Sequence, residues 1–130
     1  MNSTLKHLEL FSGVGGFRKA IDLFCNDNNI NSKCIGFSEL DKYAINTYKS
    51  NFDTTDELEI GDIDDFTLNV ENIKKIEDFD LLTGGFPCQP FSMMGAKKGF
   101  SDNRGNVFYS IIDILRIKQP KYVLLENVKN

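Results

Sequence analysis

Short apolar runs alternate along the chain with segments whose apolar residues recur at helical spacing. This alternation is typical of βαβ units, in which helices cover both faces of a parallel sheet. The sequence therefore predicts an α/β fold. The expected strands are Lys6–Phe11, Cys34–Ser38, Leu58–Gly61, Phe79–Gly84 and Lys121–Glu126, and the expected helices are Gly16–Cys25, Lys42–Asn51, Asn69–Ile76 and Asn106–Ile117.

Length and composition indicate one soluble domain. The chain has 130 residues, 41% of them hydrophobic, and no apolar run approaches the roughly 18 residues of a membrane span. The start lacks the basic and apolar segments of a signal peptide, so we expect a cytoplasmic protein without membrane contact. Three cysteines without paired spacing and a single histidine predict neither a disulfide framework nor a metal site.

The charges are unevenly distributed along the chain. The formal net charge of −4 by itself argues against a nucleic-acid partner. Residues 1–83 hold 8 Lys and Arg against 16 Asp and Glu, whereas residues 84–130 hold 7 against 3. A partner that carries phosphates is therefore expected to meet the second part, near Lys97–Asn106. The alternative is ordinary surface charge.

A glycine-rich turn, GVGG, follows the first expected strand and opens the first helix. Glycines allow a ligand to approach the backbone, and the free N–H groups of a helix N-terminus suit polar groups. Glu39 ends the second strand, where an acid can accept hydrogen bonds from ribose hydroxyls. The pattern predicts a nucleoside cofactor site. It leaves open a nicotinamide dinucleotide, S-adenosylmethionine, or a purely structural turn, since the spacing departs from G-x-G-x-x-G.

Two further residues end strands at the same edge of the sheet. Asp62, after the third strand, can accept a hydrogen bond from an adenine amino group, and Phe11, at the end of the first, can stack on the ring. The alternatives are a turn or helix cap for Asp62 and a core position for Phe11.

A cysteine, Cys88, lies between two prolines in GGFPCQPFS, directly after the fourth strand. Pro87 and Pro90 restrict the backbone on either side and would hold the thiol in place before a substrate arrives. If the fourth strand lies beside the first, Cys88 faces the point where the strand order reverses and ligands bind. The alternative is a buried structural cysteine. A zinc deaminase is excluded, since Phe91 stands where P-C-x-x-C needs a second cysteine.

A glutamate, Glu126, ends the fifth expected strand. We expect this carboxylate to lie beside Cys88, partly buried, where it could donate a proton near neutral pH; the alternative is a cap or a surface acid. A nucleophilic thiol together with an acid is what addition to an electron-poor ring needs. We expect His7 at the surface or at a strand edge, and Cys25 and Cys34 in packing roles.

Six segments resemble, in order and spacing, the first six motif blocks of the cytosine-C5 DNA methyltransferases, most closely those of the bacterial restriction-modification type. They are LELFSGVGGF, GFSELDKYAINTYKSNF, GDI, DLLTGGFPCQPFS, GFSDNRGNVF and PKYVLLENVKN. The pair formed by GGFPCQPFS and the later ENV is far more specific than the glycine turn.

The resemblance implies a Rossmann-like fold that binds S-adenosylmethionine. Leu40 stands where the family often has an aromatic residue, which puts one stacking contact in question. The cofactor-binding residues implied are Phe11, Gly13, Gly15, Gly16, Glu39, Leu40, Asp62 and Ile63.

The resemblance also implies a reaction on double-stranded DNA. Cys88 would attack C6 of a flipped cytosine, Glu126 would hold and protonate N3, and C5 would take the methyl group. The segment 91–105 would close over the DNA. The substrate-binding residues implied are Phe86, Pro87, Gln89, Ser92, Arg104, Asn127 and Val128.

The family's later motif blocks and its target-recognition region have no counterpart in residues 1–130. We therefore expect the N-terminal part of a catalytic domain, truncated after the fifth strand and completed by a missing C-terminal portion or a complementary subunit. Three alternatives stay open: a non-catalytic S-adenosylmethionine-binding subunit, a relative that methylates cytosine in tRNA, and a nicotinamide oxidoreductase.

Overall fold

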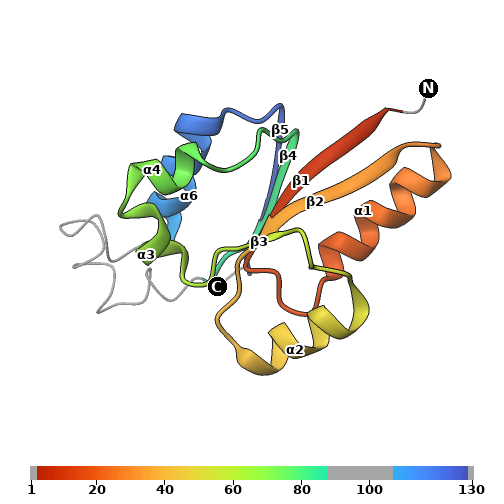
Figure 1. Cartoon of the computed structure of the whole chain (residues 1–130), viewed down its shortest axis with the longest axis horizontal. Helices are drawn as coiled ribbons and strands as arrows, with labels where there is room; N and C mark the ends of the chain where they lie inside the picture. Colours follow the sequence, from red (N-terminus) through yellow and green to blue (C-terminus); the bar gives the residue numbers. More distant parts are fainter. Residues whose placement is uncertain (1–2, 88–106, 129–130) are drawn as a thin grey trace.

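A computed structural model describes residues 3–87 and 107–128. The described chain forms a five-stranded parallel sheet with the order β3-β2-β1-β4-β5 (Figure 1). The elements are β1 (Thr4–Leu10), α1 (Gly16–Asp27), β2 (Asn31–Phe37), α2 (Lys42–Asn51), β3 (Leu58–Glu59), α3 (Ile63–Thr67), α4 (Val70–Lys74), β4 (Leu81–Gly85), α6 (Val107–Lys118) and β5 (Tyr122–Glu126). The α/β, Rossmann-like fold class predicted from the sequence is confirmed.

Helices cover both faces of the sheet. Helices α1 and α2 lie on one face, and α3, α4 and α6 lie on the other (Figure 1). Alternate side chains of β1 point to opposite faces. Leu8 and Leu10 join the core beneath α6, together with Ile111 and Ile114 from that helix. Val107 and Leu115 of the same helix pack against this core as well.

Two differences from the expected elements have local causes. Strand β2 begins at Asn31 rather than at Cys34, because three exposed polar residues pair with β1 in register and carry no apolar signal. Helix α3 was not predicted, since five residues are too short to show a helical period. The side chain of Asp62 caps it by accepting hydrogen bonds from the backbone N–H groups of Asp64 and Asp65.

The expectation for His7 was wrong. Its side chain is fully buried, because β1 pairs with β2 on one side and with β4 on the other. Burial lowers the pKa of His7 to about 4, so the ring is neutral at physiological pH. Among the described residues, neither ring nitrogen has a hydrogen-bond partner. Cys25 and Cys34 are buried, as expected.

Candidate functional site

A cavity of about 400 Å³ opens where the parallel strands end. In the observed strand order, β2 follows β1 on one side and β4 lies on the other, so the reversal falls between β1 and β4, where open α/β sheets bind ligands. The cavity contains five of the eight predicted cofactor residues. Its lining is Phe11, Ser38, Glu39, Leu40, Gly61, Asp62, Ile63, Asp64, Gly85, Pro87 and Val107.

The three predicted glycines shape the cavity without lining it. Gly13 and Gly15 have φ angles of 56° and 99°, which L side chains rarely adopt. A Cβ on Gly15 would lie 2.4 Å from Cε2 of Phe52, so the turn packs too closely against the end of α2 for a side chain. Gly16 is the first residue of α1. The backbone conformation and the close packing against Phe52 are thus enough to require glycine in this turn.

Glu39 is the most firmly fixed acid in the cavity. Its Oε1 accepts a hydrogen bond from the N–H of Gly13 at 2.8 Å. Its Oε2 accepts from the N–H groups of Leu40 at 3.1 Å and Asp41 at 3.0 Å. A carboxylate has about four acceptor positions, and three are taken here, so about one remains for a ligand hydroxyl. The backbone thus fixes the Glu39 carboxylate at the wall of the cavity.

Asp62 serves as a cap and also lines the cavity. Its Oδ1 accepts from the N–H of Asp64 at 2.9 Å and from that of Asp65 at 3.4 Å. No described residue donates a hydrogen bond to Oδ2, which leaves it able to accept one from a ligand. The buried Ile63 beside it adds an apolar surface. The sequence posed the cap and the ligand contact as alternatives, and this geometry is compatible with both.

Sequence reasoning missed Ser38. Its Oγ accepts a hydrogen bond from the N–H of Phe11 at 2.9 Å, and its carbonyl accepts from Ser12 N–H at 2.8 Å. These bonds hold Phe11 at a φ of 52°, with its ring at the cavity wall. A serine at the end of a strand has no distinctive spacing, and its position directly before Glu39 was the available signal.

The far wall of the cavity comes from α3 and α6. Asp64, which sequence reasoning also missed, accepts a hydrogen bond from the hydroxyl of Ser110, and Ser110 also lies 3.1 Å from the Thr67 hydroxyl. Val107, the first residue of α6, completes this wall. Leu40 also lines the cavity, with 70% of its surface exposed.

Glu126 lies beside the end of β4, whereas Cys88, its predicted neighbour, lies outside the described residues. Gly85 pairs in register with Glu126, and a Cβ on Gly85 would lie 2.9 Å from Oε2 of Glu126. The expectation that Glu126 is partly buried was wrong. The residue is exposed, because β5 is the outer strand of the described sheet and no described element covers its far side.

The predicted substrate residues fall into two groups. Phe86 packs against Phe108, with ring centroids 5.9 Å apart, and Pro87 lines the cofactor cavity. Asn127 and Val128 follow β5 and are exposed. The other predicted residues lie outside the described ranges: Cys88, Gln89, Ser92 and Arg104.

A second cavity, of about 530 Å³, separates α1 from β4 and β5. Its walls are almost entirely apolar and include Phe17 and Phe24 from α1 and Tyr122 and Leu124 from β5. Tyr122 and Leu124 are 61% and 51% exposed. We call this surface the α1–β5 groove. Apolar surface of this kind is typical of a site that another polypeptide segment covers.

Within residues 3–87 and 107–128, no helix is long and apolar enough to cross a membrane. The same residues contain no group of three or more His, Cys, Asp or Glu side chains arranged to hold a metal ion.

Comparison with known proteins identifies relatives of this chain. The family model for C-5 cytosine-specific DNA methylase matches residues 5–130. The chain is 42% identical to the type II methyltransferase M.HhaI of Haemophilus parahaemolyticus, over 97% of this chain and 34% of the relative. It is 45% identical to the type II methyltransferase M1.ScrFI of Lactococcus lactis subsp. cremoris, over 96% and 29%. It is 42% identical to the orphan methyltransferase M.Rho11sI of Bacillus phage rho11s, over 98% and 24%.

The chain thus spans about a quarter to a third of the length of these relatives. The match nevertheless runs through every described element, from β1 to β5. The chain belongs to the C-5 cytosine-specific DNA methylase family.

Proposed function

We propose that this chain is the cofactor-binding and nucleophile-bearing part of a DNA (cytosine-5)-methyltransferase that uses S-adenosylmethionine. The observation that carries the proposal is the cavity at the strand ends, which is lined by Asp62 and by Glu39, whose carboxylate three backbone N–H groups hold. Relatives whose names describe them as type II methyltransferases support DNA as the substrate. A protein that acts on bacterial or phage DNA would work in the cytoplasm.

The residues of the cavity fit an adenosine group. Glu39 would accept a hydrogen bond from a ribose hydroxyl, and the free Oδ2 of Asp62 would accept one from the adenine amino group. Phe11 and Ile63 supply apolar surface for the purine, while Leu40 covers less of it than an aromatic residue would. S-adenosylmethionine, when bound there, supplies an electrophilic methyl group.

The reactive groups would come from the other side of the strand reversal. Cys88 comes three residues after β4 in the sequence, and Glu126 ends β5 in register with Gly85, the last residue of β4. The Cys88 thiolate would add to C6 of a flipped cytosine while Glu126 holds a proton at N3, so that the electron pair moves to C5 and makes it nucleophilic. Once C5 carries the methyl group, loss of the C5 proton to water and expulsion of the thiolate from C6 would release the methylated base and restore the enzyme.

We further propose that the full enzyme includes a C-terminal portion, in the same chain or in a second subunit, that covers β5. The α1–β5 groove and the exposed apolar residues of β5 support this, because an unpaired apolar strand edge is a strong site for association. That portion would also carry the surface that reads the DNA sequence, since residues 1–83 are strongly acidic.

Substitution Glu39→Ala should weaken cofactor binding by roughly 1.5 to 3 kcal/mol, the usual range for hydrogen bonds to a charged group. Calorimetry with S-adenosylhomocysteine on the 130-residue chain would measure this. Glu71→Ala, which removes an exposed acid on α4 outside the cavity, is the matched control and should bind normally. Tighter binding of NAD than of S-adenosylhomocysteine by the unsubstituted chain would contradict the proposed function.

Substitution Gly85→Ala should slow methyl transfer by about 10- to 100-fold, because misplacing a reacting group by about 1 Å has effects of this size. The new methyl group would displace the Glu126 carboxylate, whose Oε2 lies 2.9 Å from its position. The displaced atom ends a flexible, exposed side chain, so stability should change little.

The matched control for Gly85→Ala is Gly84→Ala. A Cβ on Gly84 meets Leu10 at an ordinary contact distance of 3.4 Å and lies away from Glu126. Both variants would be assayed for DNA methylation with the completing portion present. Equal turnover by the two variants would show that Glu126 is not placed by Gly85.

A further inference from the structure

Glu9 is a buried acid that the proposed reaction does not use. It is the second-to-last residue of β1 and is fully buried, and its side chain points to the α1 face of the sheet because Leu8 and Leu10 point to the other. A buried carboxylate is costly unless several donors satisfy it. Its donors therefore indicate what it is retained for.

One donor belongs to the first turn of α1. The N-cap residue of this helix is Gly15, which has no side chain to accept a hydrogen bond, and the first turn contains no acid. Oε2 of Glu9 accepts from the backbone N–H of Arg18 at 3.3 Å. Glu9 thus does from the neighbouring strand what a Ser or Asp at the N-cap does in other helices. The close approach of Phe52 excludes such a residue at position 15.

The second donor is the hydroxyl of Tyr48, on α2. It lies 2.9 Å from Oε1 of Glu9, and it accepts a hydrogen bond from the Arg18 guanidinium at 3.0 Å. Arginine can only donate, so the one proton of the Tyr48 hydroxyl is directed to Glu9. Glu57 holds the same guanidinium by two hydrogen bonds of 2.7 Å. The network is arranged for an ionised Glu9.

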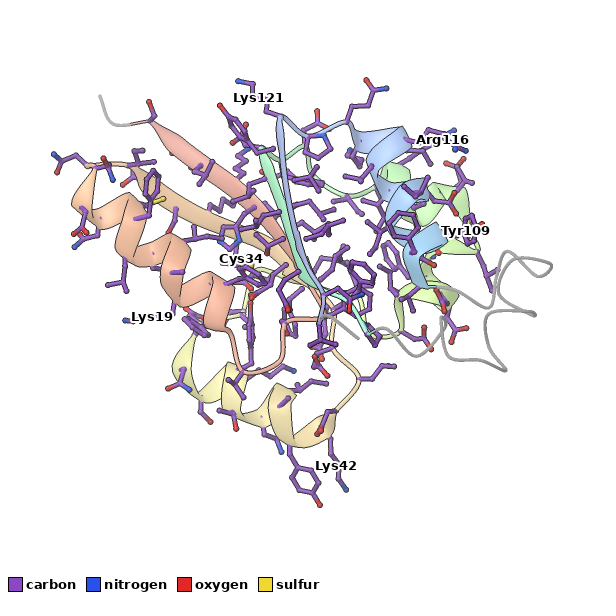
Figure 2. The ribbon with its side chains drawn as sticks, turned by 180° about the vertical axis from the view of Figure 1, so that it is seen from behind. Lys19, Cys34, Lys42, Tyr109, Arg116 and Lys121 are labelled. Atoms are coloured by element: carbon purple, nitrogen blue, oxygen red, sulfur yellow. The ribbon has the colours of Figure 1, made fainter. Side chains whose placement is uncertain are left out.

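The start of α1 connects directly to the cofactor cavity. The N–H of Gly15 donates to the carbonyl of Ser12, and within this turn the N–H of Gly13 donates to Glu39. A shift of the first turn of α1 would therefore move a donor that orients Glu39. Figure 2 shows the α1–α2 side of the sheet, with Cys34 of β2 in its interior and Lys19 and Lys42 pointing outward.

We propose that Glu9 is a positioning residue for the cofactor: its ionised carboxylate caps α1 from β1 and thereby fixes the glycine turn that orients Glu39. This inference rests on the proposed cofactor site and assigns it a pH dependence. Loss of the Glu9 charge would loosen the turn and weaken binding, without any contact between Glu9 and the cofactor.

The surroundings of Glu9 support a titration near neutral pH. Burial raises its pKa to about 7, while the hydrogen bonds from Tyr48 and Arg18 oppose the rise. Strand β4 contributes the neutral Thr83 as its register partner. The charged and titratable groups nearby are Arg18 on α1, Tyr48 on α2, Glu57 before β3, Cys34 on β2 and His7 on β1.

The sign of the expected pH effect follows from this raised pKa. Glu9 is ionised above about pH 7 and protonated below it. Cofactor affinity should therefore fall as the pH is lowered from 8 to 6, by up to about tenfold, because the binding-competent fraction falls by that factor. A His7 titration cannot produce this effect, since burial lowers its pKa to about 4.

The test is calorimetric titration of the 130-residue chain with S-adenosylhomocysteine between pH 6 and 8. Glu9→Gln keeps the shape, but its amide nitrogen cannot accept, so one of the two donors, the Arg18 N–H or the Tyr48 hydroxyl, loses its acceptor atom. It should bind about fivefold more weakly at pH 8, the usual effect of losing a cap, and its affinity should not vary with pH in this range. Tyr48→Phe keeps the ring stacked on Phe37 but removes a donor to the ionised form, so the midpoint of the pH dependence should rise.

The controls separate positioning from a purely structural role. Circular dichroism would establish that each variant folds. If Glu9→Gln kept the pH dependence of the unsubstituted chain, or if Tyr48→Phe left its midpoint unchanged, the inference would be overturned. The nitrogen-15 NMR shifts of the Arg18 and Gly13 amides should titrate near pH 7 and lose this titration in Glu9→Gln.

The amide titration requires no ligand, so it decides the inference even if the unsubstituted chain binds no S-adenosylhomocysteine. That absence of binding would count against the proposed function. Amides that fail to titrate in the unsubstituted chain would overturn the role of Glu9.

Discussion

Substitution Cys88→Ser should abolish DNA methylation by the completed enzyme, a loss of at least about 10⁴-fold, the scale on which removal of a catalytic nucleophile acts. A serine hydroxyl is far harder to ionise than a thiol, so the attack on C6 of cytosine would not occur at neutral pH. Transfer of radiolabelled methyl groups to DNA would measure the loss. Cofactor binding should be unchanged, since the substitution leaves Phe11, Glu39 and Asp62 in place.

Cys25→Ser is the matched control for this substitution. Cys25 is buried on α1 and does not line the cofactor cavity, so its replacement should lower stability slightly and leave turnover intact. A 5-fluorocytosine substrate should form a covalent adduct with the unsubstituted enzyme and with Cys25→Ser, but not with Cys88→Ser. Methylation by Cys88→Ser at nearly the unsubstituted rate would refute the mechanism.

The 130-residue chain alone should show no measurable methyl transfer, and a polypeptide that carries the family's later motifs should restore it. The chain alone should also be marginally stable or oligomeric in light scattering. Covering Tyr122, Val123 and Leu124 should raise the free energy of unfolding by roughly 3 kcal/mol, about 1 kcal/mol for each half-exposed apolar side chain. Thermal melts with and without the added polypeptide would measure this gain.

A substitution in the α1–β5 groove tests whether the added polypeptide restores activity by binding there. Leu124→Lys places a charge in the α1–β5 groove and should prevent restoration without weakening cofactor binding. The control is Leu68→Lys, directly after α3, because Leu68 is 63% exposed and Leu124 is 51% exposed. This variant should still recover methyl transfer when the polypeptide is added. Equal recovery of methyl transfer by both variants would contradict the proposal. So would a stable and active monomer of the unsubstituted chain without any added polypeptide.

The order of elements could be predicted because each long element carries its own pattern. The apolar stripe of α6 and the runs in β1 and β4 are local signals, and parallel topology then brings Phe11, Glu39 and Asp62 to one edge. The sequence could not predict effects that depend on neighbours far along the chain. His7 is buried because β2 and β4 flank it, and Ser38 acts through the backbone of Phe11.

The acids show the same limit of sequence reasoning. Glu39 and Asp62 were predicted from their places at strand ends, but Glu9 looks like any polar residue in a strand until Tyr48 and Arg18 are brought against it. The exposure of Glu126 depends on what lies beyond β5. The role of Cys88 stays a prediction, since this residue lies outside the described ranges.

The central place of β1 also has a consequence for how the chain folds as it is synthesised. Its pairing with β2 joins neighbouring segments and can form early, whereas its pairing with β4 joins residues as distant as Lys6 and Asp80, 74 positions apart. Such distant pairs close slowly. Until β4 leaves the ribosome, one edge of β1 stays unpaired and open to other chains, so slower translation of residues 38–80 would prolong the period in which the nascent protein can aggregate.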